Sequence, residues 1–428
     1  MSSELQTAAE KTLKCVRCGF CLDACPTFRL TGNEADSPRG RIYLMRSVFE
    51  KSIELDDDVR THIDACLGCR ACETACPSGV QYGDILEEFR ARIETEAIRP
   101  APQRFARHQL LNTLTSPTKS LFAMRAGAMM ERITGGKPMP AVLSNLLTGD
   151  PKAVVQLPSM SGSPKIGKLL EVSPAVGERS HRVGILAGCV MRVMFHATNE
   201  ATVRVLQQNG CDVFAPKAAG CCGALHLHTG FKSDAITRAK ALIDAFAPLN
   251  LDAIIINSAG CGSTMKEYGH LLADNPEYAE KAANFAAKCK DVSEYLIQIG
   301  ITAPLHSYDK IVAYHDACHL AHGQKITSQP RQLLRSIPGL DLVDLPESDT
   351  CCGSAGIYNL TQPVMAKRLL ERKIEFIRET GASVIAAGNP GCIAWIQQGL
   401  KSAGLDVAIR HPIDILDEAY SGVLTQGG

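Results

Sequence analysis

Several features are missing from this sequence, and each absence excludes a class of protein. No run of about 18 consecutive apolar residues occurs, so no transmembrane helix is expected. The first residues, MSSELQTAAEKTLKC, lack the apolar core of an export signal, which predicts a cytoplasmic protein. The formal net charge is +0, so no overall excess of basic residues indicates nucleic acid binding. No Gly-x-Gly-x-x-Gly follows a predicted strand, so a flavin or nicotinamide site is not expected.

Cysteine, in contrast, is abundant, with 18 copies among 428 residues. A chain without an export signal is not expected to form disulfides, so this number of thiols indicates metal ligation. All but two of the cysteines, Cys211 and Cys289, fall into repeated motifs. These two have no counterparts and are expected to be core thiols.

The first motif is the spacing C-x2-C-x2-C-x3-C-P, which occurs twice near the N-terminus. Its two copies are Cys15, Cys18, Cys21, Cys25, Pro26 and Cys66, Cys69, Cys72, Cys76, Pro77. This spacing is typical of bacterial 4Fe–4S sites, in which the fourth cysteine of one run binds the cluster of the other. It predicts two 4Fe–4S clusters, the first on Cys15, Cys18, Cys21 and Cys76 and the second on Cys66, Cys69, Cys72 and Cys25. Zinc usually takes paired cysteines and fits the triplet poorly.

Helical patterns surround these runs. Ser37 is a candidate N-cap with Pro38 in the first turn, and further helices are expected from about Asp58 to Cys66 and from Tyr82 to Glu96. We therefore predict a helical two-cluster domain over residues 1–100. The arginines between the runs, Arg39, Arg41 and Arg46, fit either a role in offsetting cluster charge or a solvated helix face.

Residues 101–180 are expected to form a basic helical connector. Its segment LFAMRAGAMMERI is apolar and helical, whereas TGGKPMP and PSMSGSPKIG have the composition of loops. Contact with a partner or an anionic membrane surface fits this composition. Simple packing between domains fits it as well.

The second motif reveals a duplication of the C-terminal half. Four cysteines recur at an offset of 129 to 131 residues, and the flanking segment DAIIINSAGC resembles SVIAAGNPGC. Short β-branched runs alternate with helices in both copies, which predicts parallel sheets with helical cover. The predicted fold class is therefore α + α/β: the helical domain and connector, followed by one α/β copy over residues 181–305 and another over residues 306–428.

The recurring cysteines follow predicted strands, where open α/β sheets bind their ligands. Two adjacent cysteines can reach one metal only across a sharp turn, which the glycine after each pair permits. We predict an iron–sulfur cluster or redox site in each copy, on Cys189, Cys221, Cys222 and Cys261 and on Cys318, Cys351, Cys352 and Cys392. Buried core cysteines are common singly but do not explain a repeated pair. Nearby histidines are His226, His228, His315 and His319, of which His315 with Asp316 is a candidate proton gate, although most such histidines are structural.

Together, the two cluster motifs with SPRGRI between them and the two Cys-Cys-Gly repeats resemble the glycolate oxidase (glycolate dehydrogenase) iron–sulfur subunits. This family belongs to the wider CCG-domain, heterodisulfide-reductase-like group. The phrases CPSGVQYGDILEEFR and CCGALHLHTG favour the glycolate branch. The heterodisulfide reductase pattern ends each repeat with C-x-x-C, whereas Ser258 and Asn389 replace the first of those cysteines here. Four cysteines per copy suit an ordinary 4Fe–4S cluster and argue against a noncubane cluster and disulfide cleavage.

The resemblance implies an iron–sulfur electron-transfer subunit without catalytic residues of its own. FAD-binding partner subunits would abstract the hydride from glycolate, and a quinone or similar membrane acceptor would receive the electrons. Such a protein would sit peripherally on the inner face of the cytoplasmic membrane. The alternatives are the same role for D-lactate or glycerol 3-phosphate, a thiol/disulfide enzyme, and a non-catalytic iron–sulfur scaffold or sensor.

Overall fold

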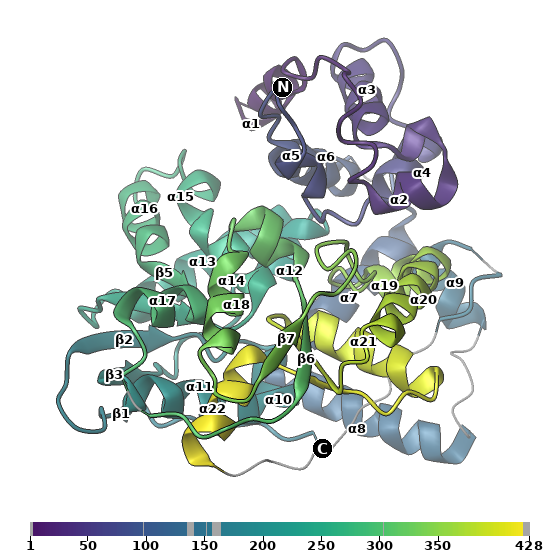
Figure 1. The fold of residues 1–428 in the computed structure, drawn as a ribbon. Coiled ribbons are helices and arrows are strands. Elements are labelled where there is room, and N and C mark those ends of the chain that lie inside the picture. Colours follow the sequence, from purple (N-terminus) through teal and green to yellow (C-terminus); the bar gives the residue numbers. More distant parts are fainter. Residues whose placement is uncertain are drawn as a thin grey trace.

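The computed structural model describes residues 3–96, 98–134, 141–150, 152–155, 164–302 and 304–422. Helices of the N-terminal region form a lobe at one end of the molecule, and two α/β units follow (Figure 1). This arrangement confirms the predicted fold class.

The N-terminal lobe is built from short helices around the two cysteine runs. They are α1 (Ser3–Thr12), α2 (Pro26–Thr31), the 3-10 turn η1 (Glu34–Asp36), α3 (Pro38–Phe49), α4 (Asp57–Asp64), α5 (Ala71–Thr74) and α6 (Tyr82–Thr95). The Ser37 side chain accepts a hydrogen bond from the Gly40 backbone at 3.0 Å, which confirms the predicted cap of α3. Met45, Ile63 and Phe89 are fully buried between α3, α4 and α6, so the lobe has an apolar core of its own.

Three helices follow the lobe: α7 (Ala101–Leu114), α8 (Pro117–Thr134) and α9 (Ala141–Thr148). Helix α8 confirms the helix predicted for LFAMRAGAMMERI, and both α8 and α9 pack against α7. The predicted loops at residues 134–140 and 158–167 fall largely outside the described residues. Within the part of the chain that the structure describes, no helix is long and apolar enough to cross a membrane.

Each α/β copy contains its own sheet. The first consists of β1 (Val172–Ser173), β2 (His181–Ile185), β3 (Cys211–Phe214), β4 (Ala253–Ile256) and β5 (Cys289–Asp291), in the order β1-β3-β2-β4-β5. The second consists of β6 (Ile311–His315), β7 (Asp341–Val343), β8 (Val384–Ala387) and β9 (Ala408–Arg410), in the order β7-β6-β8-β9. All neighbours are parallel except β1, which runs antiparallel to β3. Four strands therefore repeat with identical topology, as the duplication predicts.

Helices cover the sheets. Most of the recurring cysteines lie directly before one of these helices or in its first turn. In the first copy the helices are α10 (Val190–Met194), α11 (His196–Gln208), α12 (Ala224–His228), α13 (Lys232–Phe246), α14 (Ala259–Lys266), α15 (Tyr268–Leu271), α16 (Ala279–Lys288) and α17 (Val292–Ile299). In the second they are the π-helical turn η2 (His319–Gly323), α18 (Ser328–Arg335), α19 (Tyr358–Thr361), α20 (Pro363–Glu379), α21 (Pro390–Ser402) and α22 (Pro412–Ser421). One apolar cluster contains Val183 and Val205 from the first copy and Val312 and Ile413 from the second. The two copies thus share a core and are fixed relative to each other.

Asp291 begins α17 in the first copy. Its Oδ1 accepts a hydrogen bond from the Ser293 backbone at 2.8 Å, and Glu294 Oε2 accepts one from the Asp291 backbone at 3.2 Å. The Asp291 side chain is buried, and this burial raises its pKa from 3.8 to about 6. Because the folded pKa exceeds the unfolded value, the carboxyl favours folding below about pH 4, and this contribution is lost as the pH rises through 6.

We expect Asp291→Asn to keep the cap, since asparagine is an equally good N-cap, but to remove this pH dependence. The free energy of unfolding of the variant should rise relative to the parent by about 1.4 kcal/mol per pH unit between pH 4 and 6. Denaturant titrations at several pH values between 4 and 7 measure the difference, with Asp56→Asn at the exposed N-cap of α4 as a matched control. A difference that stays constant with pH would contradict the prediction.

Candidate metal centres

The N-terminal lobe contains two small cavities lined by cysteine. Cys15, Cys18, Cys21 and Cys76 all line the first cavity, although Cys76 comes from the other run. Cys25 lines the second together with Cys66, Cys69 and Cys72. The structure therefore brings both predicted ligand sets together in their exchanged form. Cys72 lines both cavities, so the two adjoin.

Charged and hydroxyl groups surround the sulfur atoms of the second cavity. The buried Arg41 donates from Nη1 to Thr27 Oγ1 at 3.0 Å, and Arg90 donates from Nη2 to the Cys66 carbonyl at 2.6 Å. Burial alone would raise the pKa of the Cys66 thiol, but these two guanidinium groups outweigh it and lower that pKa. Cys66 therefore favours the thiolate form, which ligates iron, whereas burial raises the pKa of the Cys69 and Cys72 thiols in the same cavity.

The arginines between the two cysteine runs have different surroundings. Arg39 pairs with Glu34 at 2.7 Å and also donates to the Arg17 carbonyl at 3.3 Å, beside the first cavity. Arg46 instead pairs with Glu50 at 2.6 Å on the outside of α3. The predicted role in offsetting charge thus fits Arg39 and Arg41, whereas Arg46 belongs to a solvated face.

In the first α/β copy, the four cysteines converge from three loops. Cys189 directly precedes α10, Cys221 and Cys222 precede α12, and Cys261 lies in the first turn of α14. The Cys221 thiol interacts with those of Cys189 and Cys222, and Cys222 interacts with Cys261. Gly223 follows with φ 81°, and a Cβ there would lie 3.0 Å from the Ala235 carbonyl oxygen. The turn that aims both thiols inward therefore requires glycine.

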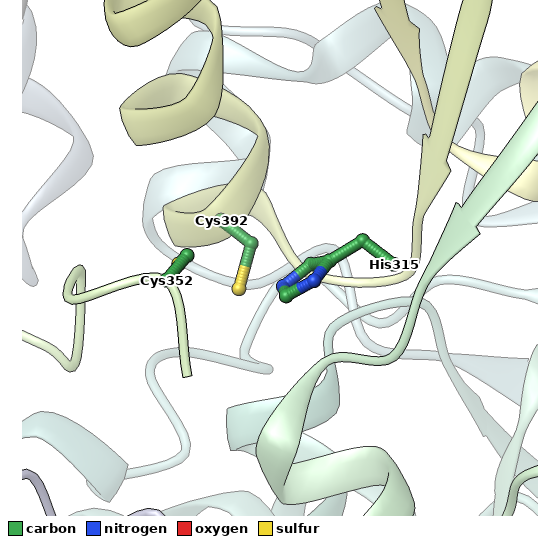
Figure 2. Close-up of side chains that lie close together, drawn as sticks. All are labelled: His315, Cys352 and Cys392. Atoms are coloured by element: carbon green, nitrogen blue, oxygen red, sulfur yellow. The ribbon is translucent and has the colours of Figure 1, made fainter. Parts of the chain in front are cut away.

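The second copy repeats this arrangement. The Cys351 thiol interacts with those of Cys318 and Cys352, and Cys352 interacts with Cys392 in the first turn of α21. Figure 2 shows that the ring of His315, at the end of β6, also points toward this group. The ligand atoms of His315, Cys352 and Cys392 lie within 4.8 Å of one another.

Both cysteine groups open onto one cavity of about 1290 Å³, which Cys66 of the N-terminal lobe and Met124 of α8 also line. The lobe packs directly on the second copy, since Tyr358 donates its hydroxyl to the Ala65 carbonyl at 2.8 Å. Cys69 and Cys318 lie close enough for their charges to interact. The four cysteine groups therefore form one connected series. Thiolate sulfur is the usual donor to iron–sulfur clusters, so the side chains present fit such clusters at every group.

Comparisons with known proteins agree with this geometry. A family model described as a 4Fe-4S dicluster domain matches residues 11–80, and one described as a cysteine-rich domain matches residues 183–266 and 312–397. The probable glycolate oxidase iron-sulfur subunit of Bacillus subtilis (strain 168) is 38% identical over 423 residues, covering 95% of this chain and 94% of that protein. The chain belongs to the family of glycolate oxidase iron–sulfur subunits. As a member of this family, it is an iron–sulfur component of an oxidoreductase and functions in electron transfer.

Two further comparisons extend this result. The glycolate oxidase iron-sulfur subunit of Escherichia coli (strain K12) is 35% identical over 408 residues, covering 95% of this chain and 93% of that protein. The crystal structure of a hypothetical protein from Helicobacter pylori superposes with a TM-score of 0.59 at 9% identity, covering 100% of this chain and 74% of that chain. At this level of identity, the likeness shows a shared fold alone. The comparisons confirm the predicted family and its iron–sulfur cofactors.

The remaining cysteines and histidines of this iron–sulfur subunit have other surroundings. Cys211 and Cys289 are buried in apolar clusters, as expected for core thiols. His228 Nδ1 lies 2.7 Å from Glu87 Oε1, and its ring packs edge to face against His319 at 4.7 Å. Burial lowers the pKa of both histidines to about 3, so both are neutral near pH 7. His226 Nε2 lies 3.3 Å from Asn112 Oδ1.

Tyr82 is a site residue that the sequence did not reveal. It lies at the start of α6, and its hydroxyl donates to Cys66 Sγ at 3.4 Å. A hydrogen bond to a cluster sulfur stabilises the more negative, reduced state and so raises the reduction potential. The cysteine spacing gave no signal for it, because the contact depends on how α6 folds back over the second run.

We therefore expect Tyr82→Phe to lower the midpoint potential of the second cluster without loss of iron. Redox titration of the purified subunit, followed by electron paramagnetic resonance, measures this shift. Tyr358→Phe is the matched control, because the Tyr358 hydroxyl donates to the backbone carbonyl of Ala65, next to Cys66, and not to a sulfur atom. Equal midpoint potentials in the Tyr82 variant and the parent would show that the Tyr82 hydroxyl does not raise the potential of the second cluster.

Proposed function

We propose that this iron–sulfur subunit transfers electrons within a membrane-associated glycolate dehydrogenase complex, from FAD-binding partner subunits to a quinone or similar acceptor. The observation that carries the proposal is the connected series of cysteine groups. The two lobe cavities share Cys72, Cys69 lies near Cys318, and one large cavity joins both α/β copies. Iron–sulfur clusters, when bound, supply one-electron transfer.

The ligand sets belong to this proposal. We assign the first lobe cluster to Cys15, Cys18, Cys21 and Cys76, and the second to Cys66, Cys69, Cys72 and Cys25. The α/β copies contribute Cys189, Cys221, Cys222 and Cys261 and, in the second copy, Cys318, Cys351, Cys352 and Cys392. Shared cavities and direct thiol interactions support these sets.

The surface beside the first cavity supports the docking of a partner protein. Cys18 is exposed, and the neighbouring side chains of Val16 and Phe20 are each 69% exposed. Arg17 stacks over the ring of the exposed Tyr43 at 4.4 Å and extends this face. An apolar face next to a cysteine group is suited to bring a flavoprotein within electron-transfer distance.

Helix α8 supports peripheral contact with the inner face of the cytoplasmic membrane. Phe122 and Met129 are largely exposed on it, and Lys119 and Arg125 lie among them. Exposed apolar side chains bordered by basic ones favour binding at an anionic lipid surface. The same helix lines the large cavity, so an acceptor dissolved in the bilayer would have a short path to the α/β cysteine groups.

The test is substrate-dependent bleaching of the visible iron–sulfur absorption. The tagged subunit is purified anaerobically from its host with its bound partners, and glycolate, D-lactate or glycerol 3-phosphate is added. Bleaching by glycolate in the complex, but not in the isolated chain, is the expected result. Bleaching by one of the other two compounds alone would move the same role to another substrate. If none bleaches and a disulfide is turned over instead, the dehydrogenase role is wrong.

A further inference from the structure

The residue three positions before the first cysteine of each group differs between the two α/β copies. Three residues before Cys189 lies Leu186, and three residues before Cys318 lies His315. Leu186 is buried among apolar side chains. The second copy therefore has an imidazole where the first copy has a hydrocarbon side chain. This position lies just before the first cysteine of the group.

His315 lacks the contacts that usually satisfy a buried imidazole. It is 1% exposed, and its Nδ1 atom has no hydrogen-bond partner among the described residues. The ring interacts with the Cys352 thiol and points toward Cys392 (Figure 2). The ligand atoms of His315, Cys352 and Cys392 lie within 4.8 Å of one another, so an iron held by these cysteines would lie within reach of the imidazole.

The neighbouring polar side chains have other partners. The Asp316 carboxylate is held by Arg331 through contacts of 2.7 and 2.6 Å. Asn389, which stands where the wider group has a fifth cysteine, donates from Nδ2 to Cys392 Sγ at 3.5 Å. The adjacent histidine of the loop, His319, is bonded to the Gly68 carbonyl at 3.0 Å. His315 is thus the imidazole that faces the sulfur atoms of the second copy.

We propose that His315 is a nitrogen ligand to iron in the second α/β copy, so that the two copies hold chemically different sites. The first copy offers four thiolates, and the second offers four thiolates and one imidazole. This inference rests on the iron–sulfur clusters proposed above for these cysteines. Replacing thiolate by neutral imidazole at an iron raises its reduction potential.

The decisive measurement is nitrogen hyperfine coupling in the holoprotein. The full chain is labelled with nitrogen-15 histidine, reduced chemically without substrate or partner, and examined by pulsed electron paramagnetic resonance. We expect strong coupling from one histidine nitrogen in the parent, its loss in His315→Leu, which copies Leu186, and its retention in the matched control His319→Leu. In His315→Cys we expect full iron content and a lower midpoint potential for one cluster.

Three results would overturn the inference: no strong histidine coupling in the parent, the same coupling after His315→Leu, or zinc in place of iron at this site. If His315→Leu does not assemble its clusters, the nitrogen coupling of the parent and the midpoint potential of His315→Cys still test the inference. Chemical reduction also separates the two proposals. A complex that glycolate cannot reduce would refute the proposed substrate and leave the nitrogen coupling unchanged.

Discussion

Replacing Cys76 by alanine is expected to remove the cluster bound by the first cysteine run, with a loss of about four iron atoms per chain. The reason is that Cys76 lines the cavity of Cys15, Cys18 and Cys21, whereas Cys25 lines the cavity of the second run. A 4Fe–4S cluster that loses one thiolate ligand is exposed at one iron corner and is readily lost. Cys25→Ala should remove the other cluster for the same reason.

Paired variants make this exchange measurable. Cys76→Ala and Cys18→Ala should leave the same residual electron paramagnetic resonance spectrum, and Cys25→Ala should match Cys69→Ala. If each run instead held its own cluster, Cys76→Ala would match Cys69→Ala, and the exchanged assignment would be wrong. Cys211→Ala, which removes a buried core thiol, is the control and should retain all of the iron.

The second large effect is expected at Asp64, the last residue of α4. Its carboxylate accepts two bonds of 2.9 Å from Arg99, one of 3.0 Å from Arg60, and lies 3.7 Å from Arg107. The side chains of Asp64, Arg99 and Arg107 are at most 9% exposed. These arginines come from separate segments, so one carboxylate joins the N-terminal lobe to α7.

We expect Asp64→Ala to lower the free energy of unfolding of the lobe by about 3–5 kcal/mol, because it removes the carboxylate beside the buried Arg107 and leaves Arg99 with Glu94 alone. Denaturant unfolding, followed by the visible cluster absorption, measures this loss. Asp57→Ala is the matched control: Asp57 also pairs with Arg60, but it is 71% exposed, and such pairs contribute about 0–1 kcal/mol. Similar losses in the two variants would show that the buried cluster of charges does not stabilise the lobe.

The sequence predicted those features that depend on local spacing. The cysteine runs, the Ser37 cap and the constant offset between copies are all set by covalent neighbours or by duplication, and each can be read without tertiary contacts. Strands β5 and β9 were not predicted, because their sequences, CKD and AIR, carry no apolar run. Their pairing with β4 and β8 depends on the sheet that is already present.

Contacts between distant segments had no signal in the sequence. The packing of the lobe on the second copy, which brings Cys69 near Cys318, follows no period in the chain. The charges around Asp64 are likewise ordinary surface residues in composition and become buried only when Arg99 and Arg107 reach the end of α4. His315 was recognised as a histidine near the site and paired with Asp316, whereas the structure pairs Asp316 with Arg331. The direction of the Asp316 side chain determines its partner, and this direction cannot be read from the order of the residues.

The exchange of cysteines between the two lobe cavities also constrains how the protein is made. Until Cys76 has left the ribosome, the first cavity has three of its four thiols. Cys25 likewise lacks the cysteines of the second run with which it lines the second cavity. On the ligand sets proposed above, neither cluster site is complete until both runs have emerged. Iron binding and closure of the lobe around both runs would then be coupled.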